Sequence, residues 1–173
     1  MTVTRRLDGL GLPYMVTGSM AMNYYAVPRM TRDIDVVVEL SPADVDRLVE
    51  AFRDDFYVDP DAIGRSVAER GMFNVIHEEL VIKVDFVVRK ADEYRREEFS
   101  RRRRIRVENT DLFIVAPEDL IISKLDWARH TRSAVHLADV RNLLASVSDL
   151  DTSYLESWIG RLGLQSLYRE VSP

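Results

Sequence analysis

Two aspartates separated by one residue open a strongly apolar run, in the order Asp33, Ile34, Asp35 and then three valines. The β-branched residues predict a buried strand over residues 33–39. Because residues i and i+2 of a strand point to the same side, Asp33 and Asp35 are expected to stand close together. Neighbouring carboxylates repel each other, and the usual relief is a shared proton or a shared cation. A fold does not need such a pair for stability, whereas metal-dependent phosphoryl or nucleotidyl transfer does.

The composition is that of a single globular domain. The chain has 173 residues, of which 46% are hydrophobic and 31% are charged, as in folded rather than disordered proteins. It contains no cysteine, which excludes disulfides and thiolate metal sites and favours a cytoplasmic location. No apolar run approaches the length of a membrane span, and no signal peptide is expected. The net charge of −5 argues against a protein that coats nucleic acid indiscriminately.

Strand-like and helical patterns alternate along the first part of the chain. A short buried strand is expected at 14–17, followed by a helix at 19–27 that ends before Pro28. The further elements expected are helices at 42–54, 60–69 and 92–100, a hairpin of 72–77 and 80–89, and strands at 102–107 and 112–115. From Pro117 onward only helices are expected, at 117–129, 134–147 and 151–161.

These elements predict a mixed α/β (α+β) fold, with helices on a mixed sheet and a helical C-terminal part. Residues 1–116 are expected to form the core of the fold. Residues 117–173 are expected to pack on that core as C-terminal helices, within one compact domain.

A glycine and a serine, Gly18 and Ser19, stand where the first strand turns into a helix. Glycine lets the backbone approach a ligand closely, and the free N–H groups at the start of a helix favour a phosphate. The Ser19 hydroxyl is suited to bind a phosphate oxygen, but for this motif alone an ordinary helix N-cap is the favoured reading.

A third acid, Asp85, interrupts another apolar run, Val84 to Val88, and an acid inside such a run needs a partner. Three carboxylates on adjacent strands are suited to two Mg²⁺ ions, and the third acid is suited to accept a proton from an attacking hydroxyl. The alternative for the first two acids is a salt bridge with Arg29 or Arg32, which flank them. Those arginines either neutralise phosphate charge or balance the two acids.

A lysine and an aspartate fall inside the apolar stripes of the predicted helices that follow Pro117. Lys124 lies among Leu120, Ile121 and Leu125, and Asp139 lies beside Val140. Two such residues on inward faces must either pair with each other or line a polar pocket. In the first case the pair is structural, and in the second Lys124 reaches a triphosphate and Asp139 orients it.

Taken together, these motifs resemble a known fold family. Gly18-Ser19, then Asp33-Ile34-Asp35 after thirteen residues, then Val84-Asp85-Phe86, is similar to the signature of the nucleotidyltransferase fold of the DNA polymerase β superfamily. The segments VPRMTRDIDVVVE and PEDLIISKLDWARHTRSAVHLADVRNLL resemble the AbiEii-type nucleotidyltransferases, which include toxins of toxin–antitoxin systems. The likeness spans about residues 12–145.

The resemblance implies a role for each matching residue. Gly18 and Ser19 would bind nucleotide phosphate, and Asp33, Asp35 and Asp85 would bind metal. Lys124 would match the lysine of a later motif and Asp139 the acid of the last one, whereas His136 stands where relatives often have an acid.

The function expected is Mg²⁺-dependent transfer of a nucleoside monophosphate from an NTP to an acceptor hydroxyl, with release of pyrophosphate. The acceptor is tRNA or another RNA, as the toxin resemblance implies, or a small molecule, and an antitoxin is a further expected partner. The alternative is a non-catalytic nucleotide-binding or regulatory module of the same fold. The basic run Arg101–Arg104 with Arg106 either binds an RNA backbone or protects a solvated edge strand, and the second reading is favoured.

Overall fold

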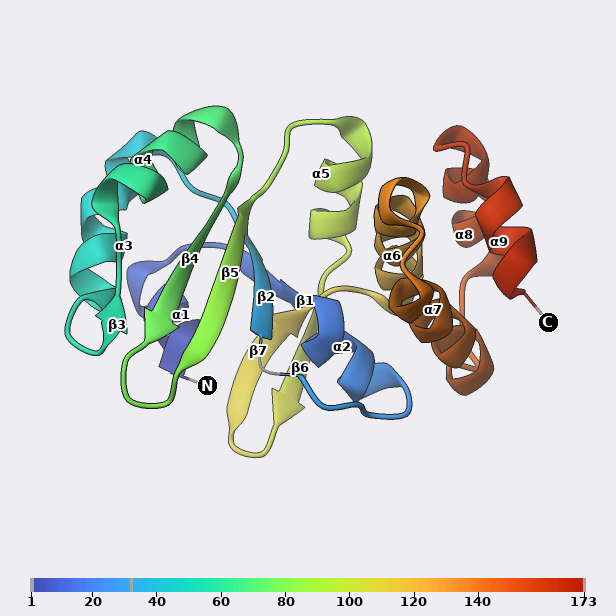
Figure 1. The fold of residues 1–173 in the computed structure, drawn as a ribbon, viewed down its shortest axis with the longest axis horizontal. Helices are drawn as coiled ribbons and strands as arrows, with labels where there is room; N and C mark the ends of the chain where they lie inside the picture. Colours follow the sequence, from blue (N-terminus) through green and yellow to red (C-terminus); the bar gives the residue numbers. More distant parts are fainter. Residues whose placement is uncertain (1, 32, 173) are drawn as a thin grey trace.

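The computed structural model describes residues 2–31 and 33–172, which form a mixed sheet covered by helices (Figure 1). The strands described are β1 (Tyr14–Thr17), β2 (Asp33–Val38), β3 (Phe56–Tyr57), β4 (Met72–His77), β5 (Ile82–Val88), β6 (Arg103–Val107) and β7 (Thr110–Ile114). The helices are α1 (Thr2–Leu10), α2 (Gly18–Tyr25), the 3₁₀ turn η1 (Pro42–Asp44), α3 (Val45–Phe52), α4 (Pro60–Glu69), α5 (Glu93–Ser100), α6 (Pro117–Thr131), α7 (Ala134–Ser146), α8 (Thr152–Arg161) and α9 (Gln165–Val171).

The mixed α/β fold class is confirmed, and each predicted element is found with ends within about two residues. The predicted helix at 42–54 is divided into η1 and α3. Three elements were not predicted, namely α1, the two-residue strand β3 and α9. The division at residue 116 remains a prediction. Among the described residues, no helix is both long and apolar enough to cross a membrane.

The order of strands in the sheet is β3-β4-β5-β2-β1-β7-β6. Central strand β2 pairs with β1 in antiparallel fashion and with β5 in parallel fashion. In this register Asp35 lies opposite Thr17 on one side and Asp85 on the other. The turn from β1 into α2 and the acids of β2 and β5 therefore meet at one place on the sheet.

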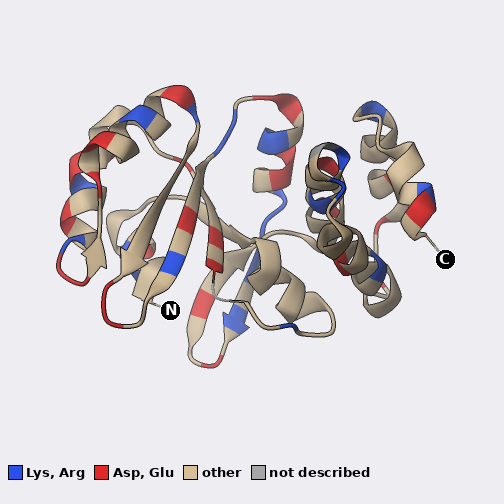
Figure 2. Ribbon diagram, in the orientation of Figure 1, with Lys and Arg blue, Asp and Glu red and all other residues tan. Residues whose placement is uncertain are grey.

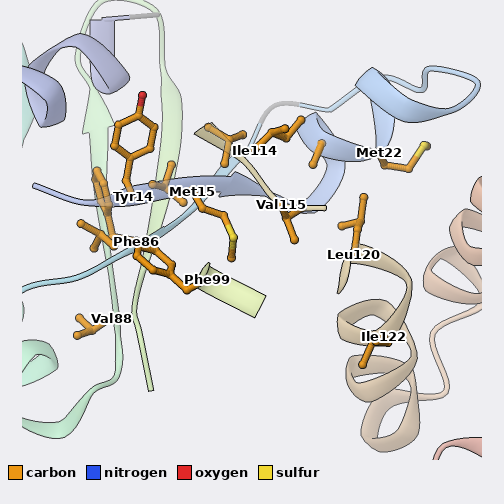
Figure 3. Close-up of a cluster of buried hydrophobic side chains, with 14 of the residues drawn as sticks. Tyr14, Met15, Met22, Phe86, Val88, Phe99, Ile114, Val115, Leu120 and Ile122 are labelled. Atoms are coloured by element: carbon orange, nitrogen blue, oxygen red, sulfur yellow. The ribbon is translucent and has the colours of Figure 1, made fainter. Parts of the chain in front are cut away.

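A continuous cluster of buried apolar side chains extends from the sheet to the C-terminal helices. Figure 3 shows part of this cluster, including Tyr14, Met15, Phe86, Phe99, Ile114, Val115, Leu120 and Ile122. Helix α2 contacts β1 and β2 on one side and α6 and α7 on the other, so it lies between the sheet and these helices (Figure 1). This packing fixes the position of α6 relative to the acids, because burial of apolar surface is the main stabilising term.

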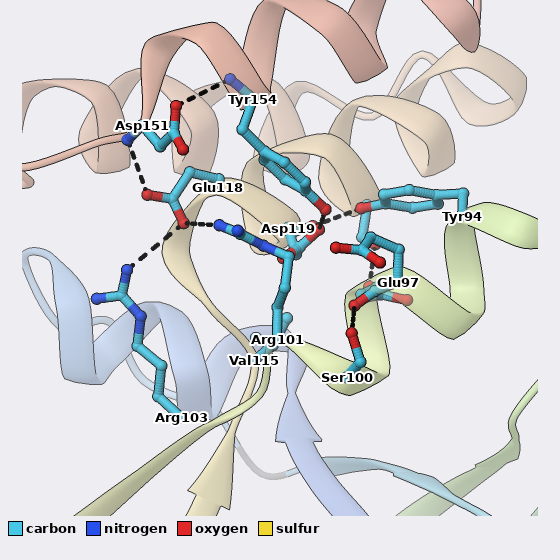
Figure 4. Close-up of polar contacts among 12 residues, drawn as sticks. Tyr94, Glu97, Ser100, Arg101, Arg103, Val115, Glu118, Asp119, Asp151 and Tyr154 are labelled. Atoms are coloured by element: carbon cyan, nitrogen blue, oxygen red, sulfur yellow. Dashed lines mark hydrogen bonds and ion pairs between the residues drawn. The ribbon is translucent and has the colours of Figure 1, made fainter.

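The start of α6 carries two buried acids that bind the basic run (Figure 4). Arg101 donates to Asp119 Oδ2 at 3.1 Å and to Glu118 Oε2 at 3.2 Å. Arg103 lies 3.6 Å from the same Glu118 oxygen, and the Tyr154 hydroxyl donates to Asp119 Oδ1 at 2.7 Å. Strand β6 is the edge of the sheet, as the favoured reading of this run expected. Binding of RNA by the run stays an untested prediction.

The network predicts a pH effect on stability that comes from Asp119. Burial, opposed by hydrogen bonds from Tyr154 and Arg101, raises the pKa of this carboxyl from 3.8 to about 6. The folded protein therefore holds this proton more tightly than the unfolded chain does, so the free energy of unfolding should fall as pH rises from about 4 to about 6. This difference in pKa corresponds to a change of about 3 kcal/mol in the free energy of unfolding. In urea unfolding at pH 4 and pH 7, Asp119→Asn should lose most of this pH dependence.

The matched control for this experiment is Asp111→Asn, because Asp111 is an exposed carboxylate that pairs with Arg104 at the sheet edge. This variant should keep the pH dependence of the wild-type protein. Equal pH dependence in all three proteins would contradict the assignment to Asp119.

Candidate functional site

Three acids lie on neighbouring strands of the sheet, with Asp33 and Asp35 on β2 and Asp85 on β5. Asp35 and Asp85 are directly opposite each other in the parallel register. Figure 2 shows acidic segments side by side on these two strands. Burial, together with the charges of Asp85 and Asp33, raises the pKa of Asp35, although a hydrogen bond from the Ser19 backbone N–H opposes the shift. Strand register thus places the three acids on one side of the sheet, and their mutual repulsion adds to the effect of burial on Asp35.

The glycine at the start of α2 is pressed against one of these acids. Gly18 has a φ of +62°, and a Cβ atom built on it would lie 1.9 Å from Asp35 Oδ2. Only glycine combines this backbone conformation with this close approach. Thr17 occupies the N-cap position of α2, without a side-chain cap hydrogen bond, so Ser19 is not the N-cap residue. The Ser19 hydroxyl instead accepts a hydrogen bond from Arg29 at 2.7 Å.

Two cations are held beside Ser19 by one buried carboxylate. Arg29 donates from Nε and Nη2 to the two oxygens of Asp139, each at 3.0 Å. Lys124 Nζ donates to Asp139 Oδ2 at 2.7 Å, and both side chains of this pair are about 5% exposed or less. Burial alone would raise the pKa of Asp139, but hydrogen bonds from Arg29 and Lys124 outweigh burial and lower it.

These contacts decide between readings that the sequence left open. Lys124 and Asp139 do pair, as the structural alternative proposed, and Lys124 also lines a cleft. The hydrogen bonds of Arg29 go to Asp139 and Ser19, and the charge of Asp35 also acts on Arg29 from a greater distance. Arg32 lies outside the described residues.

A cleft of about 250 Å³ connects these parts. Its walls are formed by Thr17, Gly18, Ser19, Asp35, Met72, Asp85, Val87, Leu120, Ser123, Lys124, Trp127 and His136. The phosphate-binding turn expected from the sequence, two of the three acids and the α6 lysine therefore share one opening.

The sequence did not identify Met72, Trp127 or His136 as part of this cleft. Trp127 and His136 lie one helical turn from Lys124 and Asp139, so helical spacing around those two residues would have found them. Met72 is on β4 and reaches the cleft only through sheet pairing. His136 Nδ1 is buried without a hydrogen-bond partner among the described residues, and burial followed by the charge of Lys124 lowers the pKa of its ring.

A lysine that sequence reasoning missed lies among the acids. Lys83 Nζ is 2.6 Å from Asp85 Oδ2 and 3.9 Å from Asp33 Oδ1. The hydrogen bond to Asp85 raises the pKa of Lys83. The signal was its position two residues before Asp85, which puts both side chains on the same side of the strand. In the part of the chain that is described, no three acidic or histidine side chains are already gathered to hold a metal ion.

No protein-family model and no curated protein sequence matches the chain. Several solved structures do match it. The antibiotic-resistance factor ANT(2'')-Ia is 13% identical, with a TM-score of 0.61 over 98% of this chain and 94% of that one. An antigenic nucleotidyltransferase-like protein from Paracoccidioides brasiliensis is 15% identical, with a TM-score of 0.59 over 96% and 88%. The lincosamide antibiotic adenylyltransferase LnuA is 10% identical, with a TM-score of 0.55 over 84% and 94%.

At these identities the comparisons concern the fold alone. The chain has the fold of the nucleotidyltransferases, as the motifs predicted.

Proposed function

We propose that this protein is a metal-dependent nucleotidyltransferase that transfers a nucleoside monophosphate from an NTP to an acceptor hydroxyl and releases pyrophosphate. One observation carries the proposal. The Gly18 turn is packed against Asp35 at the edge of a cleft that Asp85 and Lys124 also line. Packing alone does not require repelling carboxylates beside a closely packed glycine turn, whereas phosphoryl chemistry uses both.

The acids are of the type that binds a divalent cation such as Mg²⁺, but in the described residues their side chains are not already gathered around one point. Asp33, Asp35 and Asp85 offer hard oxygen ligands on adjacent strands, and a lysine ammonium already stands among them as a stand-in cation. They would hold the two ions expected, which would neutralise charge on the triphosphate and on the attacking oxygen. Asp85 is suited to accept the proton of the attacking hydroxyl.

The opposite wall of the cleft suits the triphosphate. Ser19 offers a hydroxyl and Lys124 an ammonium group, and Arg29 stands behind Ser19. Asp139 acts as a positioning residue, because it holds both cations where an NTP would place its phosphates. His136, with its orphaned Nδ1, is suited to bind a polar group of the same nucleotide.

For the acceptor we favour a small hydroxylated molecule. The chain covers 94% of the length of both LnuA, solved with lincomycin bound, and ANT(2'')-Ia, an antibiotic-resistance factor. LnuA is an adenylyltransferase, so ATP is the first nucleotide to test. The AbiEii-type resemblance supports the second candidate, a cytoplasmic toxin that modifies tRNA and has an antitoxin. The non-catalytic module is disfavoured, because a module that needs no metal gains nothing from three acids on one side of two adjacent strands.

Co-crystallisation with Mg²⁺ and a non-hydrolysable ATP analogue tests the proposal. We expect the triphosphate to lie between Ser19, Lys124 and the acids. Radiolabelled NTPs should then label either a panel of lincosamides and other hydroxylated antibiotics or total tRNA, which identifies the acceptor class. Failure of every NTP and metal to bind in the cleft would overturn the enzymatic proposal. Binding without transfer to any acceptor would favour the non-catalytic module.

A further inference from the structure

We infer that Lys83 is a built-in cation that competes with the metal for Asp33 and Asp85. The inference rests on the proposed function for the identity of the metal, but its evidence is the position of the lysine itself. In the parallel pairing of β2 and β5, Lys83 lies opposite Asp33 and two residues before Asp85. Alternation along the strand directs all three side chains to one side of the sheet.

The lysine ammonium contacts the carboxylates that the proposed metal needs. Its Nζ is 2.6 Å from Asp85 Oδ2, which is a close ion pair, and 3.9 Å from Asp33 Oδ1. A divalent cation bound to the same oxygens would come within a few ångströms of this ammonium. Two positive charges at that distance repel strongly, so the metal and Lys83 cannot share these ligands.

The lysine is also free to leave. The Lys83 side chain is 41% exposed, whereas that of Lys124 is 5% exposed and fixed by Asp139. A four-carbon stem near solvent can swing its ammonium into water. The Asp85 side chain is only 15% exposed, so the incoming metal must take over as its partner. The site therefore has one fixed lysine and one displaceable lysine.

This arrangement disfavours binding of the metal ion in the absence of a nucleotide. A bare ion must displace the ammonium and gains only the carboxylates in return. An ion that arrives on an NTP brings phosphate ligands, and the displaced ammonium finds a new anionic partner in the same triphosphate. We therefore expect the metal to bind weakly alone and to bind together with the nucleotide, with Lys83 as the residue that enforces this coupling.

Direct metal binding tests the inference without an activity assay. Mn²⁺ dissociation constants would be measured by electron paramagnetic resonance on the whole chain, with and without a non-hydrolysable ATP analogue. Without nucleotide, Lys83→Met should bind Mn²⁺ about tenfold more tightly than the wild-type protein, because the competing hydrogen-bonded charge is gone. With the analogue present, the difference should shrink. In EDTA the melting temperature of Lys83→Met should be lower than that of the wild-type protein, and added Mn²⁺ should restore it.

Two variants serve as controls. Lys90→Met removes the same charge from an exposed residue just beyond the other end of β5, so Mn²⁺ binding should not change. Lys83→Arg keeps the charge and should stay close to the wild-type protein. If the wild-type protein binds Mn²⁺ and Lys83→Met binds it no more tightly, the inference is wrong and the proposed function stands. If no variant binds Mn²⁺ even with nucleotide, the metal-dependent function itself is refuted.

Discussion

Asp35→Asn is expected to abolish nucleotidyl transfer and to leave the fold intact. Asp35 is the acid closest to the glycine turn, and it is opposite Asp85 in the sheet. Asparagine keeps the shape but removes the charge that would bind the metal, so the rate should fall about a thousandfold or more. Radiolabel transfer from the NTP to the acceptor measures this loss.

The stability of Asp35→Asn should not fall along with its activity. Burial and the neighbouring acids raise the pKa of Asp35, which means that its charged form is disfavoured in the folded protein. The neutral amide should therefore keep or slightly raise the free energy of unfolding at pH 7. Asp54→Asn is the control, because the Asp54 side chain is 90% exposed. Full transfer activity in Asp35→Asn would refute the metal role of this residue.

Gly18→Ala is expected both to lower the free energy of unfolding and to weaken metal binding at the site. A Cβ at this position would lie 1.9 Å from Asp35 Oδ2, so the carboxylate would have to move. The left-handed backbone adds about 1 kcal/mol of strain for alanine, and the overlap adds about 1–3 kcal/mol. Urea unfolding should show the sum of the two, and metal binding should weaken because a ligand is displaced.

Gly11→Ala separates these two effects. Gly11 has a φ of +68°, almost that of Gly18, but nothing lies within 4 Å of the Cβ position. This control should show the backbone strain alone, with metal binding unchanged. If the two alanine variants lose equal stability and both bind metal normally, the close approach of Gly18 to Asp35 affects neither stability nor metal binding.

The strands and helices were predictable where apolar residues repeat with a clear period, as in β2 and β5. The missed elements are short, and the two missed helices bury few apolar residues. Helix α1 buries Val3, Thr4 and Leu7 between arginines and an aspartate, and α9 buries only Leu167 and Val171 among its described residues. Such segments become helical because of what they pack on, which local sequence does not specify.

The candidate site was predictable as a set of residues but not as a set of contacts. The acids, the glycine turn and Lys124 stand out because polar or flexible residues interrupt apolar runs. The bond from Arg29 to Asp139 joins residues 110 positions apart, and the place of Lys83 depends on the register of two strands. Neither long-range packing nor strand register can be derived from the spacing of residues along one segment.

The double pairing of Asp139 has a consequence for the thermodynamics of ligand binding. Arg29 and Lys124 each lose side-chain conformational entropy, up to about 2 kcal/mol, when they are immobilised. Because Asp139 already holds both of them, that entropy is lost when the chain folds and not when a ligand arrives. Binding of an anion to this wall should therefore show a small entropic penalty, which calorimetry can measure directly.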